Sequence, residues 1–310
     1  MTLAIDARGL RKRFARTDVL AGLDLAVPAG TVFALLGPNG AGKTTTINIL
    51  TTLVQADAGT AHVAGFDVAA EPEEVKRRIS LTGQSAAVDE VLTGTENLVM
   101  MGRLSGLGRT EARSRAAELL ERFGLSDAAA RRVGTFSGGM RRRLDLALSL
   151  IIAVPVVFLD EPTTGLDTRS RQELWTVIRS LADAGTTVFL TTQYLEEADR
   201  LADRIAVLDH GRIAAEGTAD ELKARIGGDV VELRDADGDL LLELPTDGTV
   251  HGLRSAIDEL DRRAASGAPG VSVAIRRPSL DDVFLAITAG GSPAGAPADG
   301  LARPELIESK

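Results

Sequence analysis

Short apolar segments alternate with amphipathic ones along most of the chain. Residues 32–36, 156–159 and 187–192 are continuous runs of apolar and β-branched side chains, which predict buried strands. Residues 111–123 carry Glu–Arg pairs four positions apart, and residues 169–184 place apolar side chains on one face. A glycine follows each segment, so both are expected to be helices. Strands that alternate with helices favour a parallel sheet covered on both faces, and the predicted fold class is therefore α/β.

Weaker patterns complete the outline of the first 226 residues. Thr93 and Glu96 have the spacing of a capping box and are expected to open a helix that continues to Met101. The other expected elements are strands at 4–6, 23–27 and 63–66, a helix at 75–79, and a hairpin formed by 205–208 and 213–215.

The composition changes near residue 227, which predicts a domain boundary. Beyond it we expect strands at 230–233, 240–244 and 271–275, a helix at 251–265, and a short helix capped by Ser279. These elements predict a small α+β domain over 227–289. Gly, Pro, Ala and Ser dominate 290–310, so a disordered tail is expected there.

Composition restricts the classes of function. The net charge of -9 and the pI of about 5.0 argue against nucleic-acid binding, which depends on Lys and Arg neutralising phosphates. The absence of cysteine excludes disulfides and thiolate metal sites. We expect neither a signal peptide nor a membrane-spanning helix, so any membrane role would need another chain to supply the spans.

The most specific pattern is a phosphate-binding loop. The octapeptide Gly37-Pro38-Asn39-Gly40-Ala41-Gly42-Lys43-Thr44 fits G-x-x-x-x-G-K-[ST], and it lies between an apolar strand and the start of a helix at Thr45. Glycines let backbone N–H groups turn toward phosphate oxygens, and the helix N-terminus adds partial positive charge. Lys43 is expected to reach the β- and γ-phosphates of a nucleotide, and the Thr44 hydroxyl to hold Mg²⁺. The alternative, a glycine turn with a chance lysine, leaves the flanking strand and helix unexplained.

Two acidic residues follow the apolar run at 156–159. They stand at the carboxyl end of a predicted strand, where open α/β sheets bind ligands. Asp160 is expected to bind the Mg²⁺ shell, and Glu161 to polarise the attacking water as a general base. The alternative is that both acids only cap a turn, which the nearby phosphate loop disfavours.

A second anion-binding nest is predicted where Ser137, Gly138 and Gly139 precede a helix. Either both nests serve one nucleotide, or each serves a different copy of the protein. The spacing of the two motifs does not distinguish these alternatives. The arginines that follow at 141–143 are more consistent with a solvated basic patch than with nucleic-acid contact.

Together these motifs resemble those of ABC transporter ATP-binding subunits over residues 3–222. The phosphate loop corresponds to Walker A, the serine–glycine nest to the signature motif, and residues 156–161 to Walker B with its glutamate. Within that family, residues 92–104, 191–199 and 279–286 resemble the daunorubicin/doxorubicin-resistance ATPases. The resemblance implies a P-loop NTPase cassette over 1–226, with a mainly parallel sheet core, an antiparallel β part and a helical subdomain at about 85–150. The domain at 227–289 is expected to be regulatory or dimerising.

The same resemblance implies a head-to-tail homodimer that holds two ATP molecules, each between the phosphate loop of one copy and the Ser137 nest of the other. Gln84 matches the family's glutamine that contacts Mg²⁺ and water, and Asp167 matches an acid that bridges the two copies. Phe14 occupies the place of the aromatic residue that stacks on adenine, although a lone aromatic there is equally compatible with core packing.

Three departures from the family pattern concern chemistry. Gln193 stands where the family usually has a histidine that contacts the γ-phosphate; an amide donates a hydrogen bond but carries no proton charge, so slow hydrolysis is expected. Met140 and Phe136 replace the usual glutamine and leucine of the signature, but they leave the Ser-Gly-Gly donors unchanged.

The resulting hypothesis is an ATPase that drives a separate ABC-2-type membrane permease in the efflux of an anthracycline-like drug. It would lie in the cytoplasm on the inner face of the membrane, with membrane contact through the permease alone. The alternatives are a soluble ABC-type ATPase that moves no solute, and a P-loop kinase or nucleotide switch. A neighbouring reading frame that encodes a chain with about six apolar helices would favour the transporter.

Overall fold

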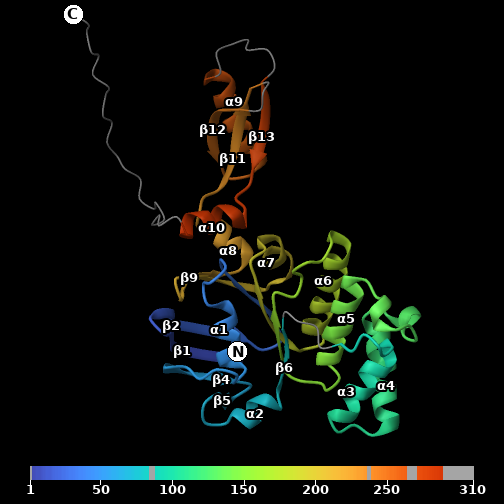
Figure 1. The fold of residues 1–310 in the computed structure, drawn as a ribbon. Coiled ribbons are helices and arrows are strands. Elements are labelled where there is room, and N and C mark those ends of the chain that lie inside the picture. The colour runs from blue at the N-terminus through green and yellow to red at the C-terminus, as the bar shows by residue number, and fades with distance from the viewer. Residues whose placement is uncertain (1, 84–87, 236–238, 264–270, 289–310) are drawn as a thin grey trace, which may run out of the picture. The chain divides into compact units, whose positions relative to one another are not determined.

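The computed structural model describes residues 2–83, 88–235, 239–263 and 271–288. The chain divides into two compact units, Met1–Ala224 and Arg225–Lys310, and each is described by itself (Figure 1). None of the helices in the described ranges combines the length and apolar character that crossing a membrane requires.

A six-stranded sheet forms the centre of the first unit, with the strand order β10-β9-β3-β8-β7-β6. All neighbouring strands are parallel except β10, which runs antiparallel to β9. Every residue of β3, β7 and β8 is buried, as expected for parallel strands covered on both faces. The strands are β3 (Val32–Leu36), β6 (Ile79–Thr82), β7 (Val156–Asp160), β8 (Thr187–Thr192), β9 (Arg204–Asp209) and β10 (Arg212–Gly217).

A second, four-stranded antiparallel sheet has the order β2-β1-β4-β5. Its strands are β1 (Leu3–Phe14), β2 (Thr17–Pro28), β4 (Ala58–Val63) and β5 (Phe66–Asp67). The single strand predicted over 63–66 is wrong, because the chain turns back there with positive φ at Ala64 (51°) and Gly65 (85°). One apolar core joins the two sheets and includes Ile5 and Phe158.

Eight α-helices lie in the described part of the first unit. They are α1 (Lys43–Leu50), α2 (Pro72–Lys76), α3 (Gly94–Leu104), α4 (Arg109–Arg122), α5 (Gly138–Ser149), α6 (Thr168–Asp183), α7 (Leu195–Leu201) and α8 (Ala219–Ala224). Helix α1 packs against strands of both sheets, whereas α3, α4 and α5 pack against one another. The predicted capping box is present, since Thr93 Oγ1 accepts from Glu96 N at 3.2 Å and Thr93 N donates to Glu96 Oε2 at 2.8 Å.

The helix predicted at 75–79 is wrong beyond Lys76, since only Val75 and Lys76 of this segment are helical. Pro72 stands at the start of α2, which already ends at Lys76. Ile79 begins β6 and pairs with Val156. The apolar spacing of this segment therefore reflects a helix end followed by a strand start, a combination that a single period does not separate.

In the second unit, a three-stranded antiparallel sheet has the order β12-β11-β13. Its elements are β11 (Asp229–Arg234), β12 (Leu240–Thr246), α9 (Val250–Arg263), β13 (Ser272–Arg276) and α10 (Leu280–Thr288). A small core includes Val231 and Leu233 of the sheet and Ala256 and Leu260 of α9. The predicted tail at 290–310 lies outside the described residues.

Candidate functional site

The phosphate loop connects buried β3 to α1, and its glycines are required by the close approach of other backbone. A Cβ at Gly37 would lie 2.6 Å from the carbonyl oxygen of Leu208. Gly42 has φ of 109°, and a Cβ there would lie 2.9 Å from Val19 O. The loop therefore admits only glycine at these two positions, and its backbone is free to face a ligand.

Lys43 is the first residue of α1, and its side chain is only 5% exposed. Its Nζ donates to the carbonyl oxygens of Gly37 at 2.8 Å and Pro38 at 3.2 Å. Glu161 Oε1 lies 3.5 Å from the same nitrogen. These contacts hold the ammonium group against the loop, as the predicted phosphate-binding role requires.

Two of the three expected magnesium ligands, Thr44 and Asp160, come together from two elements. Thr44 Oγ1 lies 3.1 Å from Asp160 Oδ2, and Asp160 Oδ1 accepts a 2.6 Å hydrogen bond from Thr191 Oγ1. A hydroxyl and a carboxylate suit Mg²⁺, which binds through one or two carboxylates and substrate phosphates rather than an all-protein cage. These groups thus fit Mg²⁺ held jointly with a nucleotide.

Glu161 has an unusual backbone conformation for a residue with a side chain, with φ of 47°. Its N–H group donates to both O and Oγ1 of Thr191, each at 3.1 Å, and Thr164 Oγ1 donates to Glu161 Oε2 at 3.3 Å. Such conformations persist where the surrounding structure fixes them, and they concentrate at functional sites. Neighbouring β8 thus holds the Glu161 turn in place.

Several of these groups line one cavity of about 510 Å³, although Asp160 and Thr191 are not among its lining residues. It lies at the carboxyl edge of the central sheet, because the phosphate loop follows β3, Asp160 ends β7 and Gln193 follows β8. The described lining residues are Val19, Asn39, Gly40, Gly42, Lys43, Thr44, Thr45, Glu161 and Gln193. Gly37, Pro38 and Ala41 belong to the loop but do not line the cavity.

A buried carboxyl group anchors the helix after Gln193. Glu197 is fully buried in α7 and accepts a hydrogen bond from Trp175 Nε1 at 3.2 Å. Burial raises the pKa of Glu197, and hydrogen bonds from Thr192 and neighbouring groups oppose that effect only in part. The start of α7, and with it the turn that carries Gln193, is therefore tied to α6.

The second predicted nest forms the N-terminus of α5, away from the cavity lining. Ser137 is the N-cap, and its Oγ accepts from Met140 N at 3.2 Å. Asp167 caps α6 in the same way and accepts from the Ser170 N–H at 2.8 Å, a hydrogen bond that lowers the pKa of this exposed carboxyl group. Neither Ser137 nor Asp167 lines the cavity.

One other predicted residue, Phe14, does not line the cavity. Phe14 ends β1 and is 47% exposed, with Lys12 Nζ 5.4 Å from its ring centroid. Gln84 lies outside the described residues, directly after Gly83.

Sequence reasoning did not include Thr191 and Val19 in the site. Thr191 contacts both Asp160 and the Glu161 N–H, and Val19 lines the cavity. The signal for Thr191 was its place in a pair of threonines at the end of the strand predicted at 187–192. Val19, an apolar residue within β2, carried no such signal.

Gly139 is the tightest position in the serine–glycine nest, and its replacement tests the nest. A Cβ there would overlap the Cβ and Oγ of Ser170 on α6, so Gly139→Ala must displace one helix from the other. We expect ATPase activity to fall at least about tenfold, while ATP binding at the phosphate loop changes little. Gly108→Ala at the N-terminus of α4 is the control, since nothing lies within 4 Å of the added carbon. Recovery of activity in Gly139→Ala/Ser170→Gly would confirm the steric cause, and wild-type activity of Gly139→Ala alone would contradict it.

Three comparisons place the chain among known proteins. A family model described as "ABC transporter" matches residues 20–164. The chain is 52% identical over 328 aligned positions to the daunorubicin/doxorubicin resistance ATP-binding protein DrrA of Streptomyces peucetius, covering 100% of this chain and 98% of that protein. It is 48% identical to the doxorubicin resistance ATP-binding protein DrrA of Mycobacterium tuberculosis, covering 92% of this chain and 94% of the relative.

Solved structures agree with these matches. The ADP conformation of an ATP-binding cassette of an ABC transporter aligns with a TM-score of 0.66 at 25% identity, covering 71% of this chain and 93% of that one. The predicted α/β P-loop fold is thereby confirmed. The chain therefore belongs to the ABC transporter ATPases, within the family of daunorubicin/doxorubicin-resistance ATP-binding proteins, and it uses ATP and Mg²⁺.

Proposed function

We propose that this chain powers the export of an anthracycline-like drug as a head-to-tail homodimer that drives a separate ABC-2-type membrane permease. The observation that supports a dimer is that the two anion nests are separate from each other. Lys43 and the phosphate loop line the cavity, whereas Ser137 and Gly139 do not. A nest outside its own chain's nucleotide cavity is available to a nucleotide bound by a second copy.

The proposed hydrolysis uses the groups around the cavity. Lys43 neutralises charge on the β- and γ-phosphates, and Gln193 donates an amide hydrogen bond to the γ-phosphate. Thr44, Asp160 and Gln84 would hold Mg²⁺, which would supply Lewis-acid stabilisation of phosphate charge. Glu161 accepts a proton from the attacking water, whose oxygen bonds to the γ-phosphorus as the bond to ADP breaks. Loss of the γ-phosphate then loosens the two copies.

The drug class follows from the relatives, whose printed names refer to daunorubicin and doxorubicin resistance. The drug pathway would lie in the permease. The chain itself would contribute the energy and the conformational change.

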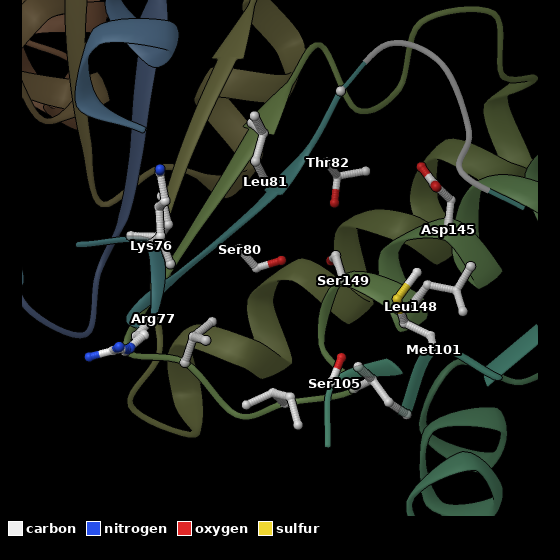
Figure 2. A pocket seen from close by; sticks show the side chains of 15 residues that line it. Lys76, Arg77, Ser80, Leu81, Thr82, Met101, Ser105, Asp145, Leu148 and Ser149 are labelled. Atoms are coloured by element: carbon white, nitrogen blue, oxygen red, sulfur yellow. The ribbon is translucent and has the colours of Figure 1, made fainter. Parts of the chain in front are cut away.

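A groove on the first unit is the proposed site of the permease contact (Figure 2). It has a volume of about 470 Å³, and it lies between β6, which carries Leu81, and α5, which carries Leu148. Lys76 and Arg77 also line it. Gly83 also lines the groove, and it directly precedes Gln84 in the sequence.

Reconstitution with the permease tests this function. We expect an anthracycline such as daunorubicin to stimulate ATP hydrolysis in vesicles that contain both chains, and not in the ATPase alone. Ser105→Arg fills the groove from an exposed lining position and should abolish both stimulation and co-purification while the isolated ATPase keeps its basal rate. Leu104→Arg is the matched control, because Leu104 is 76% exposed and does not line the groove. If the drug stimulated Ser105→Arg as strongly as the wild type, the groove would not be the permease contact. If no candidate drug stimulated hydrolysis, the export role would be refuted.

A further inference from the structure

Arg142 is a largely buried cation that none of the proposed chemical steps uses. It lies in α5, five residues after Ser137, and its side chain is 11% exposed. The sequence suggested a solvated basic patch for 141–143, but this guanidinium group points into the protein. Its acceptors belong to three separate segments of the chain.

Two of these acceptors flank Glu161. Arg142 Nε donates to the carbonyl oxygen of Pro162 at 2.9 Å, and Nη2 donates to the carbonyl oxygen of Asp160 at 3.5 Å. The guanidinium therefore contacts the backbone on both sides of the residue that has φ of 47°. Thr191 holds the N–H group of the same turn, so the strained backbone is fixed at three points.

The other contacts connect this turn to the rest of the cassette. Arg142 Nη1 donates to the carbonyl oxygen of Gly83 at 2.7 Å, one residue before Gln84. The same atom lies 3.3 Å from Asp145 Oδ2, a carboxylate that is only 4% exposed and lies one turn further along α5. One side chain thus joins the helix of the serine–glycine nest, the end of β6 and the Glu161 turn.

We propose that Arg142 is a positioning residue, which fixes the Glu161 turn and makes its geometry depend on the position of α5. This inference rests on the proposed role of Glu161. A nucleotide held by Ser137 of one copy would move or steady α5, and Arg142 would transmit that position to Glu161 of the same copy. The two nucleotide cavities of a dimer would then be coupled through this guanidinium.

The chemistry of the contacts explains why arginine suits this position. Its planar fork presents several N–H donors in fixed directions, whereas lysine offers one compact charge. Burial lowers the pKa of Arg142, and the nearby carboxylate of Asp145 opposes that effect. Lysine would reach one carbonyl group but would not hold both sides of the turn.

The test separates turnover from nucleotide binding. We expect Arg142→Gln to lower kcat by about 10- to 100-fold, because small misplacement of a catalytic group has effects of that size, while the KM and Kd for ATP stay within about threefold. Arg142→Lys should recover only part of kcat. Arg142→Gln removes the guanidinium group that contacts buried Asp145. In the double variant Arg142→Gln/Asp145→Asn the buried side chain is neutral, so its burial costs less free energy. The double variant should show the same loss of kcat.

Arg115→Gln is the matched control. Arg115 holds two backbone carbonyl groups, those of Leu150 at 2.9 Å and Ile151 at 3.3 Å, but it does not contact the Glu161 turn. It should lower thermal stability to a similar extent while kcat stays within about twofold of wild type. An equal loss of kcat in Arg115→Gln would reduce Arg142 to a structural role, and wild-type kcat in the double variant would overturn the proposal. Normal turnover in Glu161→Gln would instead refute the proposed mechanism, so the two failures are distinguishable.

Discussion

Glu161→Gln is expected to bind ATP but to hydrolyse it about 10²- to 10⁴-fold more slowly than the wild type. The amide keeps the size of the side chain and an oxygen that can accept from Thr164, but it does not take a proton from water. The backbone contacts of the turn with Thr191 involve no side-chain atom of Glu161, so folding should be preserved. The variant should therefore stop at the ATP-bound state and accumulate a closed dimer.

Phosphate release and size-exclusion chromatography with ATP and Mg²⁺ measure these two effects. Glu196→Gln is the control, because Glu196 is an exposed acid of α7 that does not line the cavity. It should hydrolyse ATP normally and remain in the same oligomeric state as the wild type. Normal turnover in Glu161→Gln would show that another group accepts the proton.

Lys43→Ala is expected to lower kcat/KM at least about 10²- to 10³-fold, which corresponds to a loss of about 2.7–4 kcal/mol of transition-state stabilisation, by analogy with other preorganised donors. The side chain is nearly fully buried, and its removal takes the donor from the carbonyl groups of Gly37 and Pro38 and the partner from Glu161. Both binding and turnover should suffer, because the ammonium meets phosphate charge in the ground state and in the transition state. Lys43→Arg should not restore activity, since a planar fork does not reproduce a compact ammonium in this loop.

Titration with a fluorescent ATP analogue and steady-state phosphate release separate the two effects. Lys223→Ala provides the control, because Lys223 forms a partly exposed ion pair with Asp199 at 2.6 Å. Such pairs contribute about 0–1 kcal/mol, so stability should change little and ATPase activity should stay at the wild-type level. Retention of ATP affinity in Lys43→Ala would mean that the backbone amides of the loop bind the phosphates without it.

The long apolar runs were the most dependable part of the sequence. The strand predicted at 187–192 has those bounds in the structure, and the run at 156–159 extends by one residue to Asp160. The segments at 63–66 and 75–79 failed because each spans the boundary between two elements. A turn with positive φ at Ala64 and the early end of α2 at Lys76 depend on conformations that the apolar spacing does not record.

The candidate site divides in the same way between local and distant contacts. Lys43 and Thr44 were identified from one octapeptide, because the phosphate loop, its preceding strand and its helix are consecutive in the chain. Thr191 was missed because it contacts Asp160 and Glu161 only when β8 lies beside β7. This strand pairing brings together residues about thirty positions apart in the sequence. Arg142 was misjudged as solvent-facing because the direction of a cationic side chain is set by what packs on its helix.

The sequence by itself determined the phosphate loop, the acidic end of β7 and the α/β class, because each depends on residues that are adjacent or regularly spaced. Only the tertiary structure decided that the Ser137 nest lies outside the nucleotide cavity of its own chain and that Ser170 closes the space beside Gly139. It also placed the Arg142 guanidinium on the carbonyl groups around Glu161. Such contacts join residues from separate strands and helices. The periodicity of one segment predicts its own secondary structure but not which segments become its neighbours in the sheet.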